Sequence, residues 1–135
     1  MRGMPSSGRQ DAAGRRFRPS LIAKGALVSL FLSLCGCIIA GTMMFLTDLT
    51  FDRLPAVAPD LLIILSIIGG SLYSARGGAE SGWLHGGLTG LVYVLVTAFL
   101  GYLLAGGADA QIILSRLVLG FVIGGISGVI AVNLD

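Results

Sequence analysis

Four long apolar runs constrain the fold of this chain more than any other feature of its sequence. They cover residues 21–46, 57–75, 83–104 and 110–132, and each run holds at most one charged residue. A helix of about 20 apolar residues spans the ~30 Å hydrocarbon core of a bilayer, since each residue adds ~1.5 Å. Short polar links join the runs, so neighbouring helices must run antiparallel. The sequence therefore predicts an all-α, polytopic membrane protein with four antiparallel transmembrane helices.

The composition agrees with a lipid environment. Of the 135 residues, 55% are hydrophobic and 12% are charged. Soluble domains carry about 25% charged residues. A chain this short cannot hide so much apolar surface in a water-soluble core. We therefore expect the lipid bilayer to surround a single domain formed by residues 21–135.

The basic residues are concentrated at one end of the chain. Residues 1–20 are rich in Gly, Ser, Pro and Arg, and we predict that they form a disordered basic tail. The basic residues before position 25 are Arg2, Arg9, Arg15, Arg16, Arg18 and Lys24. With both termini in the cytoplasm, these residues and Arg76 lie inside, whereas only Arg53 lies in an outer link. The bias predicts a multi-pass protein of the cell (plasma) membrane with both termini cytoplasmic, and no nucleic-acid partner is expected.

Small residues recur at every fourth position in the later part of the chain. The rows are Ser66, Gly70, Ser74 and Gly78, then Gly82, Gly86 and Gly90, and finally Gly120, Gly124 and Gly128. Residues four apart lie on one face of a helix. Small side chains on such a face let two membrane helices approach closely. The rows therefore predict glycine-mediated packing of the second, third and fourth helices near their cytoplasmic ends.

One basic residue lies well inside an apolar run. Arg116 is about six residues, or roughly 9 Å, from the start of the fourth helix. A charge in hydrocarbon is costly, so such a residue is usually paired, functional or extended to the headgroups. Asp60 and Asp109 are predicted at similar depths. Ion pairing, extension to the outer headgroups and a role in transport are therefore three open explanations of Arg116.

The rare polar and aromatic side chains gather around the second link. They are Arg76, Glu80, Trp83 and His85. A Trp and a His at a helix entrance are typical of the membrane interface, where the rings lie beside headgroups or the turn. Catalysis needs a converging acid, base or nucleophile, and no such spacing surrounds these residues. We predict no catalytic residue, no cofactor and no metal site, and we expect Cys35 and Cys37 to act as small apolar residues.

The same region carries a resemblance to a known family. Its most specific part is the run Gly82-Trp83-Leu84-His85-Gly86-Gly87-Leu88, with Gly69-Gly70 and Ala75-Arg76 before it and Gly90 and Tyr93 after it. Near the end of the chain, Gly124-Gly125, Gly128-Val129 and Val132-Asn133-Leu134 also match. These residues resemble the YrzE-like small membrane proteins of Firmicutes over roughly residues 21–135. The resemblance implies a four-helix membrane fold and no activity.

Two functional hypotheses follow from these observations. The first is a non-enzymatic membrane protein that assembles through its glycine faces, as a homo-oligomer or within a larger membrane complex. The second is a small transporter or channel subunit that uses Arg116 and Asp60. We favour the first, because a pore or carrier usually holds more polar residues inside the membrane.

Overall fold

The computed structural model describes residues 18–48, 52, 57–77, 81–107 and 109–134. Its long helices are α2 (Pro19–Thr47), α3 (Val57–Gly77), α4 (Gly82–Ala105) and α5 (Ala110–Asn133). All four are long and apolar enough to cross a membrane, and the described residues contain no strand. The prediction of an all-α, four-helix membrane protein is confirmed. Residues 1–17 of the predicted tail, together with Gly78 and Glu80, lie outside the described residues.

The ends of the helices follow from local backbone chemistry. Helix α2 begins at Pro19, two residues earlier than predicted, because proline has no N–H to leave unpaired and its φ already suits a first helical turn. Helix α4 ends where Gly106 takes a left-handed φ of 73° and its N–H donates to the Tyr102 carbonyl at 3.0 Å. Glycine adopts this conformation without a steric penalty. The chain therefore turns directly from α4 into α5.

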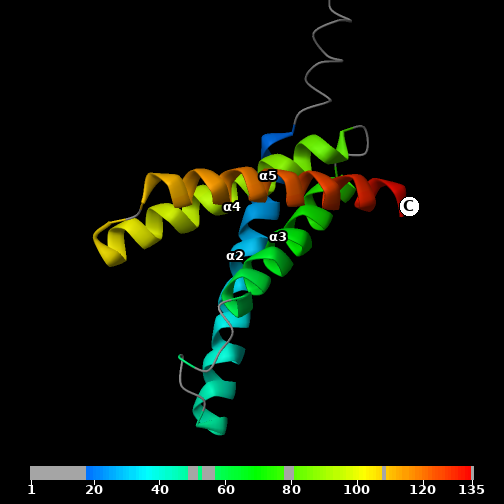
Figure 1. Cartoon of the computed structure of the whole chain (residues 1–135). Coiled ribbons are helices and arrows are strands. Elements are labelled where there is room, and N and C mark those ends of the chain that lie inside the picture. Colours follow the sequence, from blue (N-terminus) through cyan, green and yellow to red (C-terminus); the bar gives the residue numbers. More distant parts are fainter. Residues whose placement is uncertain (1–17, 49–51, 53–56, 78–80, 108, 135) are drawn as a thin grey trace, which may run out of the picture.

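The helices form two antiparallel pairs. Helix α2 lies beside α3 and helix α4 lies beside α5, and the two pairs cross at a wide angle (Figure 1). The start of α2, the end of α3, the start of α4 and the end of α5 meet in what we call the closed end. The opposite ends of the two pairs diverge, and we call this region the open end. In Figure 1 the α4–α5 pair extends to the left and the α2–α3 pair extends downwards.

Burial is confined to the closed end. The buried residues lie within residues 22–29 of α2, 66–75 of α3, 82–94 of α4 and 120–131 of α5. Few of them are large, since Tyr93 and Ile67 have the two bulkiest fully buried side chains. The core is therefore built mainly from close backbone contacts, and large side chains interlock only around Ile67, Tyr93 and Val94.

Candidate functional site

The tightest contact in the molecule joins α4 to α5 through facing glycines. Gly86 lies against the Gly124 carbonyl, and Gly90 lies against the Gly120 carbonyl. Gly82 and Gly128 form the third pair along the same antiparallel seam. A Cβ at Gly86, Gly90, Gly124 or Gly128 would fall closer than 3.0 Å to the facing backbone. The structure thus brings the third and fourth helices together at six of the eight glycines in the predicted rows.

The seventh glycine belongs to a second contact, between α2 and α3. Gly70 lies against the side chain of Ser29 and the carbonyl of Gly25. A Cβ at Gly25 would in turn meet Ser74 Cβ at 2.6 Å and Thr89 Cγ2 at 3.0 Å. Helices α2, α3 and α4 therefore approach one another at one point, and the seven row glycines that the structure describes, all except Gly78, face other parts of the same chain.

Several buried hydroxyl groups lie in this core, and one of them forms a hydrogen bond between two helices. Ser71 Oγ donates a hydrogen bond to the carbonyl of Gly86 at 3.1 Å, which links α3 to α4. Ser29 and Thr89 instead donate to the carbonyls four residues before them in their own helices. Ser74 Oγ is also buried, yet it has no hydrogen-bond partner in the described part of the chain. Ser71 and Ser74, two of the three serines of α3, are thus both buried, but only Ser71 has a hydrogen-bond partner among the described residues.

This difference gives a matched pair of substitutions. Ser71→Ala is expected to lower the free energy of unfolding by about 0.5–1.5 kcal/mol, because a hydrogen bond between two helices is lost. Ser74→Ala is expected to leave the stability unchanged or to raise it, since an unpaired buried hydroxyl carries an uncompensated desolvation cost. Unfolding of the purified protein in detergent, followed by circular dichroism, measures both. A larger loss of unfolding free energy from Ser74→Ala than from Ser71→Ala would contradict the assignment of the hydrogen bond to Ser71 alone.

His85 lies inside the closed end. Its side chain is 1% exposed, whereas the neighbouring Trp83 is 54% exposed. His85 Nε2 accepts a hydrogen bond from the backbone N–H of Arg18 at 3.3 Å, and Nδ1 lies 3.0 Å from the carbonyl of Ser81. An N–H can only donate and a carbonyl can only accept, so the ring is neutral with its proton on Nδ1. His85 therefore holds the start of α2 against the start of α4. The contact with Ser81 agrees with the expected contact with the turn, whereas the hydrogen bond from Arg18 was not expected.

Arg76 is the other ionisable residue of the second link that the structure describes. Arg76 is exposed in the last turn of α3, where its charge favours the negative end of the helix dipole. Within the described residues, no group of three His, Cys, Asp or Glu side chains lies close enough to hold a metal ion. Both ring nitrogens of His85 already have partners. The hydrogen bonds of His85 thus connect the starts of α2 and α4.

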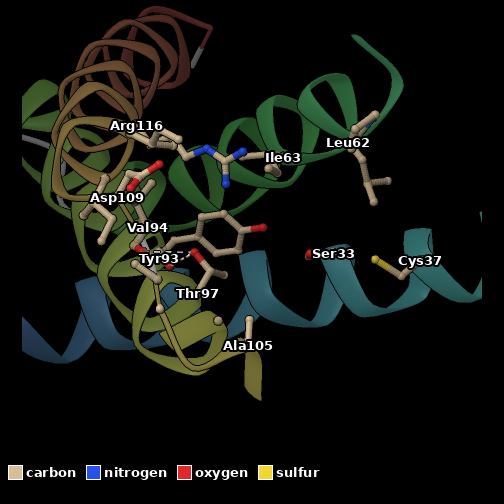
Figure 2. Close-up of a pocket in the computed structure, with 16 residues that line it drawn as sticks. Ser33, Cys37, Leu62, Ile63, Tyr93, Val94, Thr97, Ala105, Asp109 and Arg116 are labelled. Atoms are coloured by element: carbon tan, nitrogen blue, oxygen red, sulfur yellow. Dashed lines mark hydrogen bonds between the residues drawn. The ribbon is translucent and has the colours of Figure 1, made fainter. Parts of the chain in front are cut away.

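A crevice opens where the two helix pairs diverge. Its volume is about 590 Å³, and residues from all four helices line it, including Ser33, Ile63, Tyr93 and Arg116 (Figure 2). A neighbouring cavity of about 380 Å³ shares Arg116 and Ile63. The guanidinium of Arg116 extends from α5 towards Ile63 of α3 (Figure 2). Polar groups of the open end thus face a hollow with predominantly apolar walls.

Arg116 forms no ion pair with a residue that the structure describes. The predicted neighbours are nearby, since Asp109 lines the crevice and Asp60 lines the neighbouring cavity. Neither carboxylate comes within ion-pair distance. The wide crossing of the two helix pairs keeps α3 and α5 apart at this level, so pairing of Arg116 with Asp60 or Asp109, one of the three explanations from the sequence, is not observed.

Sequence reasoning missed several residues of these two regions. Gly25 and Ser29 have the same four-residue spacing as the later rows, and that spacing in the first run was the available signal. The hydroxyl-bearing residues Ser71 and Thr89 flank glycines of the rows. Tyr93 stands seven residues after Gly86, on nearly the same helix face. Only the packing shows that its ring is buried and that it lines the crevice.

The comparisons with known proteins identify a family without an assigned activity. No curated protein matches the chain, and no solved structure matches it. One family model, described as a protein of unknown function (DUF3792), matches residues 19–131. The match begins at the first residue of α2 and includes all four helices up to the last turn of α5. Because it covers most of the chain, this protein belongs to the DUF3792 family of proteins of unknown function.

Proposed function

We propose that this protein is a non-enzymatic assembly component of the cell membrane, and that it first assembles with a second copy of itself. The glycine rows predicted from the sequence are occupied by contacts within the chain. The partner surface must therefore lie elsewhere. The open half of α2 is the best candidate, because it contacts few other parts of the chain.

Gly41 carries the proposal. It lies inside α2, and nothing lies within 4 Å of the position that its Cβ would occupy. A glycine inside a helix costs about 1 kcal/mol relative to alanine, so it usually has a packing reason. No contact within the chain supplies that reason at Gly41. On the same face, Ile38 is 61% exposed and Phe45 is 85% exposed.

The chemistry of this face fits a second α2 helix. Two copies in one membrane share the same orientation, so their α2 helices would run parallel around a two-fold axis. Gly41 would then lie against Gly41, while Ile38 and Phe45 pack on either side. Close approach at a small residue is the usual way in which transmembrane helices associate.

The test is the oligomeric state of the full chain in mild detergent, measured by sedimentation. The wild type is expected to be a dimer and Gly41→Leu a monomer, because the leucine would hold the two backbones apart. Gly101→Leu is the matched control, since Gly101 is also a helix glycine with nothing within 4 Å, but it lies on α4. A dimer that survives Gly41→Leu, or a wild type that is monomeric at all protein concentrations, would refute the proposal.

Transport is the second candidate function, and one observation favours it. Arg116 faces the crevice, and the described residues supply it with no ion-pair partner. Loss of ion flux from proteoliposomes on Arg116→Ala, with an intact dimer, would favour a transporter or channel subunit over the assembly component.

Three features support the location and the absence of catalysis in this proposal. The distribution of basic residues favours the plasma membrane, with the closed end and both termini at the cytoplasmic side. The resemblance to YrzE-like proteins of Firmicutes implies the same membrane location and stays a prediction. The only histidine of the chain has its ring nitrogens engaged with Arg18 and Ser81, which leaves it unsuited to act as a base.

A further inference from the structure

The crevice at the open end has the size and walls of a ligand site. Its volume of about 590 Å³ lies within the ~300–1,000 Å³ range of small-molecule sites. Apolar side chains from three helices line it, among them Leu62, Val94 and Ile112. Gly101 lies on its α4 side, where no side chain fills the space. An apolar chain fits this hollow better than water does.

A buried polar group points into the crevice. Tyr93 is 1% exposed and belongs to the wall of the crevice, and its hydroxyl is directed towards Ser33 (Figure 2). That hydroxyl forms no hydrogen bond with any residue in the described ranges. Since Tyr93 lines the crevice and its oxygen is not among the described buried side-chain atoms without a partner, the hydroxyl can donate a hydrogen bond to a polar atom of a molecule bound there.

Arg116 adds a positive charge at the same place. Its guanidinium has five N–H donors and reaches into the crevice without an ion-pair partner among the described residues (Figure 2). A charged side chain in the membrane interior is unfavourable unless an opposite charge accompanies it. A phosphate suits a guanidinium best, because two of its oxygens accept parallel hydrogen bonds. The ligand that fits Arg116 therefore carries a phosphate.

A negative charge lies further out along α5. Asp109 precedes the first residue of α5 and lines the crevice, about 10 Å along the helix from Arg116. Inward of Arg116, the neighbouring cavity is lined by Ile67, Leu119 and Ile123, so from the interior to the mouth the two hollows present apolar walls, a cation and a carboxylate. A phospholipid with an amino headgroup has the complementary order of acyl chain, phosphate and ammonium.

We infer that the crevice binds one membrane phospholipid whose headgroup carries a phosphate followed by a primary ammonium. The phosphate lies on the guanidinium of Arg116 and receives the hydroxyl hydrogen of Tyr93. The ammonium lies at the carboxylate of Asp109. One acyl chain lies against the apolar walls of the neighbouring cavity, beside Ile67 and Ile123. This inference is independent of the proposed dimer, because Gly41 does not line the crevice.

The test is competitive retention of lipids by the full chain, read by native mass spectrometry. The purified protein is offered equal amounts of phosphatidylethanolamine, phosphatidylglycerol and phosphatidylcholine with the same acyl chains. We expect phosphatidylethanolamine to be retained several-fold over the other two. Equal retention of the three lipids, or preference for phosphatidylglycerol, would overturn the inference. Displacement of the lipid by millimolar phosphoethanolamine alone would show a site for free phosphate esters and would also overturn it.

Variants separate the contributions of the two charges. Arg116→Gln is expected to lower retention of all three phospholipids about 10-fold, since it removes a charged hydrogen bond to phosphate. Arg116→Lys keeps the charge and is expected to restore part of that loss. Asp109→Asn is expected to remove only the preference for phosphatidylethanolamine over phosphatidylglycerol. Unchanged retention in Arg116→Gln would overturn the inference.

Two further substitutions serve as controls. Arg76→Gln removes the same charge from the closed end and is expected to leave retention unchanged, so an equal loss there would refute a specific role for Arg116. Gly101→Leu fills the crevice and is expected to lower lipid retention while the dimer persists. Gly41→Leu is expected to abolish the dimer while lipid retention stays unchanged. Failure of the lipid site and failure of the dimer are therefore distinguishable.

Discussion

Gly124→Ala is expected to separate α4 from α5, whereas the same substitution at the neighbouring Gly125 leaves the pair intact. The methyl group at position 124 would collide with the carbonyl of Gly86, which belongs to the backbone of a helix and cannot move alone. At position 125 the methyl group would lie 3.6 Å from the carbonyl of Trp83, an ordinary contact. Forcing extra volume into a packed core costs about 1–3 kcal/mol.

The measurement is the free energy of unfolding in detergent, with wild type, Gly124→Ala and Gly125→Ala compared side by side. We expect Gly124→Ala to lose about 1–3 kcal/mol or more, and Gly125→Ala to be neutral or slightly stabilised by its better helix propensity. The two substitutions add the same methyl group to adjacent residues, so general effects on the membrane or detergent cancel. Equal stabilities of the two variants would mean that the seam between α4 and α5 is not packed as described.

His85→Leu is the second substitution with a large expected effect. It removes the acceptor for the Arg18 N–H and the donor to the Ser81 carbonyl. The Ser81 carbonyl keeps the backbone N–H groups of Leu84 and His85 as donors, so the Arg18 N–H is the group left without its partner, at a cost of up to about 1–3 kcal/mol. We expect lower stability of the protein and faster hydrogen exchange of the Arg18 amide, because the start of α2 is no longer fastened to α4. Circular dichroism and hydrogen exchange detect the two effects separately.

A second variant distinguishes the hydrogen bonds from the shape of the ring. The side-chain oxygen of His85→Gln can accept from the Arg18 N–H, so this variant is expected to restore part of the protection of the Arg18 amide. Trp83→Leu is the control, because it also replaces a ring by leucine in the same helix turn, but on the exposed side. Its free energy of unfolding is expected to lie within about 0.5 kcal/mol of the wild-type value. Identical exchange in His85→Leu and wild type would refute the role given to His85.

The helices were predictable because lipid imposes a length and a hydropathy on each crossing. The expected ranges differ from the observed helices by two residues or fewer at every end. The seam between α4 and α5 also follows a local rule, as Gly86 and Gly124 belong to rows with four-residue spacing. Gly25 was missed because the first run was read for its hydropathy, although Ser29 completes the same spacing.

The contacts of the two prominent polar residues were beyond sequence reasoning for physical reasons. The partner of His85 is a backbone N–H 67 residues away, and every residue except proline offers that group. No side-chain pattern could therefore identify Arg18. The surroundings of Arg116 depend on how widely the two helix pairs diverge. That angle arises from the sum of contacts at the closed end, which local spacing does not reveal.

The placement of the core at one end changes how substitutions will be tolerated along the chain. An ordinary amphipathic helix has a sensitive face and a permissive face along its whole length. Here the sensitive and permissive parts are instead the two ends of each helix. The backbones touch at Gly25, Gly70, Gly86 and Gly124, and they diverge beyond Val94. A saturation scan of this protein would therefore divide each helix into a stretch that accepts only small residues and a stretch that accepts most apolar ones. We therefore expect sequence drift to be concentrated in the second stretch.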